Sequence, residues 1–163
     1  MNGDELPDPH HVMRFVPKKH LIKDEDGKLT GGIHPEAFQL KPKDEGRLSV
    51  TWLEYFAGDY TEQSVAAVKA LRASLTIKPN DGFAVGQIAS IKARCQSRRH
   101  QVRVIYAPVD SNKAHAEVLQ LPAEEMILLE ELATGEWSNL VLNSSVEAGA
   151  ISAPDAAAYQ PPQ

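Results

Sequence analysis

The sequence has a single cysteine, Cys95, among its 163 residues. No disulfide can form within one chain, and no metal site built from several cysteines is available. The N-terminus lacks the basic and apolar segments of a secretory signal, and no stretch approaches the roughly 18 apolar residues of a membrane span. We therefore expect a cytoplasmic protein that does not bind membranes, with Cys95 as a small buried side chain.

Most sequence motifs of catalysis are also missing. The sequence has no glycine-rich phosphate loop, no dinucleotide fingerprint, no nucleophile elbow and no pair of histidines at helical spacing. The acidic turn at residues 24–27 has glycine at its fourth position and Pro35 at the twelfth, where a calcium-binding EF-hand loop needs glycine at the sixth and glutamate at the twelfth. We therefore expect no metal ion and no cofactor.

What the sequence does have is an uneven distribution of charge. Its total of −5 combines an acidic block at residues 1–63, with 8 Lys or Arg against 12 Asp or Glu, a basic block at 64–113, with 9 against 2, and an acidic block at 114–163, with none against 8. Net charge bears on association rather than on fold. The basic block therefore indicates either internal ion pairs or an acidic partner.

Short segments of alternating or apolar residues predict an antiparallel sheet. Strands are expected at residues 12–16, 20–23, 28–30, 48–56, 102–106 and 116–121. Helices are expected at 61–75, with Thr61 as the N-cap and Val65, Val68, Leu71 and Leu75 as the apolar stripe, and from Pro122 to Gly135. The fold class is α+β: a mostly antiparallel sheet of four to six short strands with two or three helices packed on it.

One segment, Ala84–Arg98, fits two patterns. As a strand it would alternate, and as a helix it would place Val85, Ile88, Ile91 and Cys95 at near-helical spacing. Its length favours a helix. Residues 1–11 are expected to form a flexible lead-in, 12–142 a single domain, and 143–163 a disordered tail, because the tail is rich in small residues and proline.

Two groups of residues are candidates for catalysis. On a strand, His115 and Glu117 would point to the same side, and Arg103 on the preceding strand would approach them. A histidine beside a carboxylate can act as a general acid or base, although a hydrogen bond to a turn would also explain His115. The second group is His34 and Glu36, held by the intervening proline, which would form one wall of a cleft or serve only loop packing.

A basic surface is the third candidate site, for an acidic partner or another anion. Arginines that cluster in this way can meet nucleic-acid phosphates, with a steep dependence on salt. An overall pI of about 5.7 and the scarcity of nearby aromatics oppose nucleic-acid binding. The acidic C-terminal block offers an internal or intermolecular counterpart. The residues of this basic surface are Lys92, Arg94, Arg98, Arg99, His100 and Arg103.

Several stretches resemble small bacterial proteins that have no assigned activity. The similar segments are residues 12–17, 32–40, 48–54 and 113–118, the last followed by Leu121-Pro122. The resemblance spans roughly residues 12–137 and implies one domain in a bacterial cytosol. Such proteins often look like accessory members of multi-gene cassettes, including those that respond to phage. The resemblance assigns no catalytic residue.

These observations favour a non-catalytic accessory module that binds an acidic protein, or a second copy of itself, through the basic surface. The alternatives are a small metal-independent enzyme with ribonuclease-like chemistry, with His115 as acid or base and Arg103 as the stabilising charge, and a nucleic-acid-binding module. Whether His34, His115, Glu117 and Arg103 line one pocket separates these alternatives.

Overall fold

A computed structural model describes residues 2–147. It confirms the α+β fold class. Within the described residues, six antiparallel strands form one sheet in the order β6-β7-β4-β1-β5-β8, and β2 and β3 form a separate hairpin. The strands are β1 (His11–Val16), β2 (Leu21–Lys23), β3 (Leu29–Ile33), β4 (Arg47–Trp52), β5 (Gly82–Gln87), β6 (Arg103–Tyr106), β7 (His115–Leu119) and β8 (Asn139–Leu142).

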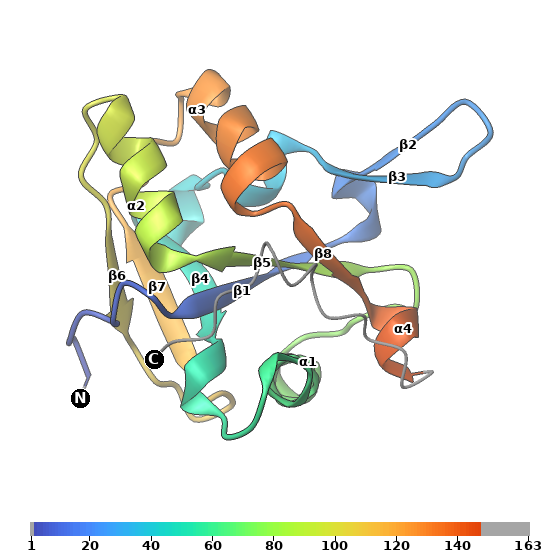
Figure 1. Ribbon diagram of the computed structural model, residues 1–163, viewed down its shortest axis with the longest axis horizontal. Coiled ribbons are helices and arrows are strands. Elements are labelled where there is room, and N and C mark those ends of the chain that lie inside the picture. The colour runs from blue at the N-terminus through green and yellow to red at the C-terminus, as the bar shows by residue number, and fades with distance from the viewer. Residues whose placement is uncertain (1, 148–163) are drawn as a thin grey trace.

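Helices cover both faces of the sheet, as Figure 1 shows. Helices α2 (Ile88–Ser97) and α3 (Met126–Glu131) lie on one face, and α1 (Tyr60–Ser74) lies on the other, with the short α4 (Asn143–Glu147) beside it. Alternation along β1 supplies both cores: Val12 and Val16 pack toward α2 and α3, whereas Met13 packs toward α1. No helix of residues 2–147 is long and apolar enough to cross a membrane.

The sheet divides between β1 and β4. Strand β1 pairs with β5 along its whole length but pairs with β4 only at Val12↔Trp52 and Met13↔Thr51. In Figure 1, β4, β6 and β7 run steeply while β1 and β5 run across the view. Beyond Met13 the two strands separate, and the backbone groups facing the gap need partners other than each other.

The segment 84–98 was wrongly predicted as one helix. It is the end of β5 followed directly by α2, and the change falls between Gln87 and Ile88. Strand β5 lies between β1 and β8 with its first five residues buried. A Cβ at Gly86 would lie 2.7 Å from Cδ1 of the buried Trp137, so the strand needs glycine there. The length argument failed because the two elements adjoin without a loop.

Helix boundaries also differ from those predicted. Helix α1 begins at Tyr60, and its N-cap is Asp59, whose Oδ1 accepts a hydrogen bond from the Glu62 amide at 2.9 Å. Leu75 follows the helix and is 43% exposed, so the predicted apolar stripe ends one turn early. The helix expected from Pro122 starts at Met126 and continues into a π-helical turn at Leu132–Glu136, and the strand expected to reach Phe56 ends at Trp52.

The two ends of the described chain are part of the fold. Residues expected to form a flexible lead-in run beside β6, where the Leu6 amide donates to Val104 O at 2.9 Å and the Tyr106 amide donates to Asp4 O at 2.8 Å. The first five residues of the expected tail form α4. The remainder of that expectation, 148–163, lies outside the described residues. Strand β8 was not predicted at all.

Candidate functional site

Most of the basic surface is paired within the chain. On α2, Arg94 Nε lies 3.0 Å from Glu136 Oε1, and Arg98 is hydrogen-bonded to Glu131. Three further pairs involve the same surface: Lys92–Asp8 at 2.7 Å, His100–Glu125 at 2.9 Å and Arg103–Glu5 at 2.8 Å. The acidic C-terminal block therefore serves as an internal counterpart of the basic block, together with the N-terminal residues.

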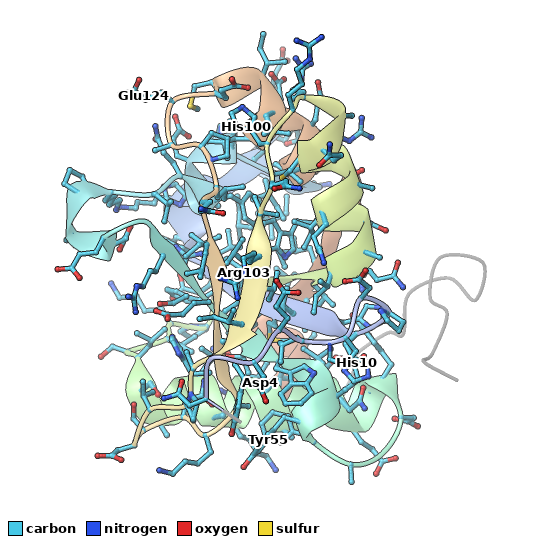
Figure 2. The ribbon with its side chains drawn as sticks, turned by 90° about the vertical axis from the view of Figure 1, so that its left-hand side faces the viewer. Asp4, His10, Tyr55, His100, Arg103 and Glu124 are labelled. Atoms are coloured by element: carbon cyan, nitrogen blue, oxygen red, sulfur yellow. The ribbon has the colours of Figure 1, made fainter. Side chains whose placement is uncertain are left out.

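The predicted catalytic group of His115, Glu117 and Arg103 does not come together. Arg103 is the first residue of β6, the strand at one edge of the sheet, and is labelled on that strand in Figure 2. There it lines a hollow of about 520 Å³ with Glu5 and Lys92. Glu117 instead faces Arg47 at 3.5 Å. Of the predicted residues, His115 and Glu36 line a common cavity, which is a different one.

That cavity occupies the gap between β1 and β4 and has a volume of about 370 Å³. Side chains from both faces of the sheet reach it, because the strands are unpaired there: Arg14 and Val50 from one face, Met13 and Thr51 from the other. The 3₁₀ turns η1 (Lys18–His20), η2 (Pro35–Phe38) and η3 (Pro42–Asp44) contribute to its wall. We call it the strand-gap cavity.

Arg14 lies in this gap and replaces part of the missing strand pairing. Its Nε donates to Ala37 O at 3.1 Å, and its Nη1 donates to Ser49 O at 2.9 Å. The guanidinium thus ties η2 to β4 and holds a fixed positive charge at the cavity wall. Burial lowers the pKa of Arg14 from its usual value, and Asp44 opposes that shift.

The cavity is lined by more cations than anions. Arg14 and three lysines, Lys19, Lys41 and Lys43, oppose two carboxylates, Glu36 and Asp44. In contrast to the basic surface, none of these lysines has a carboxylate oxygen of residues 2–147 within 4.0 Å. A protein with a net charge of −5 therefore keeps unpaired positive charge at one cavity.

His20, which lines the cavity, has a lowered pKa and a ring nitrogen without a hydrogen-bond partner among the described residues. Burial lowers its pKa below the usual value, and the positive charge of Lys19 lowers it further; Glu36 opposes this shift, and Lys41 and His34 add smaller effects that lower the pKa. Its Nδ1 is buried without a hydrogen-bond partner among the described residues. A buried, unpartnered imidazole nitrogen among cations is a costly arrangement that an anionic ligand would relieve.

His115 has a defined orientation in the same cavity. Its Nδ1 lies 2.7 Å from Ala107 O, so Nδ1 carries the hydrogen and Nε2 is left as an acceptor in the neutral ring. The hydrogen bond to a turn that the sequence offered as an alternative for His115 is therefore present. His34 lies beside the cavity rather than on its wall, and its amide donates to His20 O at 2.8 Å.

Sequence reasoning missed most of this site, namely Arg14, His20 and the lysines. One signal was present: Arg14 is the only charge in the apolar run Val12–Val16. A charge inside a core strand needs a specific partner or a function. In addition, two lysines lie in the polar connection 41–46, which was treated only as a connection.

Comparison with models of protein families, with curated proteins and with solved structures finds no match. The resemblance to small bacterial proteins, and the link to phage response that it suggested, gain no support from these comparisons.

Proposed function

We propose that this chain is a binding module for a small oxyanion, a phosphate or a carboxylate, held in the strand-gap cavity. The single observation that carries the proposal is the contrast between its two groups of cations. Five of the six residues of the basic surface, all except Arg99, face carboxylates, whereas the lysines of the cavity do not. Unpaired charge around a recess is what an anionic ligand would neutralise.

Thermal unfolding in the presence of inorganic phosphate tests this proposal. A ligand that binds only the folded state raises the unfolding temperature in proportion to the logarithm of its concentration. We expect phosphate to stabilise the protein more than sodium chloride of equal ionic strength. The double variant Lys41→Ala and Lys43→Ala should lose this difference.

A matched control removes the same charge elsewhere. Lys23 and Lys28 are exposed residues of the β2–β3 hairpin and do not line the cavity. Replacing both by alanine should leave the phosphate effect intact. If both double variants lost the phosphate effect equally, stabilisation by phosphate would depend on net charge alone, and the proposal would be overturned.

A catalytic use of the same cavity is the second candidate, and the fixed orientation of His115 favours it. An acceptor Nε2 is suited to a general base, with Arg14 in place of Arg103 as the stabilising cation. Hydrolysis of bis-p-nitrophenyl phosphate that is lost in His115→Ala, while phosphate still binds, would support this function. Binding without turnover supports the module.

Binding of an acidic protein through the basic surface is less favoured. A partner would have to displace the carboxylates that already face Arg94, Arg98 and Arg103. The same argument applies to nucleic acid, which would in addition meet a chain of negative net charge. Charge reversal at Arg98 and Arg99 would weaken association if either proposal holds.

A further inference from the structure

The strand-gap cavity has two chemically different ends. Its charged wall consists of Arg14 and the residues of η1, η2 and η3 described above. Its opposite wall is formed by apolar side chains of β1 and α1, which are Met13, Phe15, Leu71 and Leu75. Resting on the proposed oxyanion site, we infer that the ligand is an amphipathic oxyanion: a charged headgroup at the basic end joined to an apolar body at the α1 end.

The alternation of side chains along β1 explains where the apolar wall lies. Met13 and Phe15 are two residues apart on β1, so both project toward α1, and both belong to or pack against the core beneath that helix. Leu71 lies in the last turn of α1, and Leu75 directly follows the helix, so both lie at its C-terminal end. The wall is therefore continuous from the sheet to the helix.

The exposure of Leu75 beside the cavity is not explained by a ligand that consists of a charged headgroup alone. It follows the last turn of α1 and is 43% exposed, although the cavity lies beside it. A ligand with an apolar body would cover this side chain, whereas a bare phosphate would leave it in water. Exposed apolar side chains are common singly, but this one borders a recess that is already apolar.

The size of the cavity limits the ligand. At about 370 Å³ it lies near the lower end of the range for small-molecule pockets, roughly 300–1,000 Å³. It can enclose a headgroup with a short chain or a single ring, and a long acyl chain would extend beyond it. Ser49 and His115 line it as well and offer polar contacts to a ligand.

The test is a series of soluble alkyl phosphates, measured by titration calorimetry below their micelle concentrations. Inorganic phosphate, butyl phosphate and hexyl phosphate share one headgroup and differ only in apolar surface. Each added methylene should tighten binding by up to about fourfold, the factor that corresponds to ~0.8 kcal/mol per buried methylene. Affinity that does not change from phosphate to hexyl phosphate would overturn this inference and leave the oxyanion site standing.

Variants separate the two ends of the cavity. Leu75→Ser should flatten the dependence on chain length, whereas Lys41→Ala should weaken binding of all members of the series. The matched control is Ile127→Ser, because Ile127 is a 64% exposed apolar residue of α3 that does not line the cavity. It should leave the chain-length dependence intact. If no member binds to the wild-type protein, both proposals fail.

The same headgroup chemistry occurs in free metabolites and in membrane lipids. Vesicles that contain phosphatidic acid provide the second arm of the experiment. Binding of hexyl phosphate without retention on vesicles would identify a free ligand, and retention that Leu75→Ser abolishes would identify a lipid; either supports the amphipathic ligand. Vesicle retention that Leu75→Ser leaves unchanged would be electrostatic and would count against it.

Discussion

The guanidinium of Arg14 donates to the main-chain carbonyl of Ser49 at 2.9 Å, just beyond Met13↔Thr51, the last pair between β1 and β4. A side chain thus takes over a bond that a neighbouring strand would otherwise make. The same guanidinium reaches Ala37 O, which fixes the position of η2 relative to the sheet. Arg14 therefore both forms part of the wall of the strand-gap cavity and stabilises the sheet.

Replacement of Arg14 by methionine should lower the free energy of unfolding by about 1–3 kcal/mol, because the part-buried hydrogen bond to Ala37 O and the exposed one to Ser49 O are both lost. Denaturation in urea measures this loss. The stability of Arg14→Lys should lie between those of the wild-type protein and Arg14→Met, since an ammonium group cannot reproduce the forked geometry of the guanidinium. The control is Arg47→Met: the side chain of Arg47 is 58% exposed, so the loss should stay below about 0.5 kcal/mol. Equal losses at Arg14 and Arg47 would refute the structural role of Arg14.

Gly86→Ala should destabilise the protein by about 1–3 kcal/mol, because the new Cβ would lie 2.8 Å from the main-chain oxygen of Glu136 and even closer to the Trp137 ring. Gly135→Ala is the matched control. The nearest atom to its Cβ would be an Arg94 nitrogen at 3.9 Å, which is an ordinary contact. Thermal unfolding of both variants measures the difference, and a Gly86→Ala protein as stable as the wild type would contradict the close packing of Trp137 against Gly86.

His20 should make stability depend on pH. Because burial lowers its pKa in the folded state, the unfolded chain binds the proton more readily, and stability falls as pH drops below the ordinary histidine pKa of about 6.5. The loss stops below the folded-state pKa. Urea unfolding between pH 8 and pH 5 should show a weaker decline for His20→Gln. Identical pH profiles of the two proteins would contradict this assignment.

Cys95 should react slowly with thiol reagents. Its side chain is fully buried in the core under α2, and burial, helped by Glu136, raises the pKa of its thiol to about 11. The thiolate, which is the reactive form, is then scarce at pH 8. Labelling by Ellman's reagent should therefore follow opening of the fold and accelerate strongly in urea. Complete labelling within seconds in native buffer would contradict the burial of Cys95.

Local sequence patterns predicted the elements whose signals are local. Alternation at residues 48–52 identified β4, and the Asp-Gly pair identified the β2–β3 hairpin, where Gly27 has a φ of 79°. The patterns failed at 84–98 because strand and helix adjoin there, and at β8 because four residues after a π-helical turn give too short a signal.

The candidate site was harder to predict than the fold. Of the candidate catalytic residues, His115 and Glu36 line the strand-gap cavity, whereas Arg103 lines the other hollow and Glu117 lines neither. The gap between β1 and β4 is a property of strand pairing, and the ion pairs of α2 join residues far apart in sequence. Neither can be read from spacing along the chain.

A titration of the isotopically labelled protein with inorganic phosphate, followed by amide chemical shifts, tests the central claim most directly. The account predicts saturable shifts at Arg14, His20, Lys41 and His115, around the strand-gap cavity, and small ones along α2. Shifts concentrated at Arg98, Arg99 and Arg103, or no saturable shift at any residue, would contradict it.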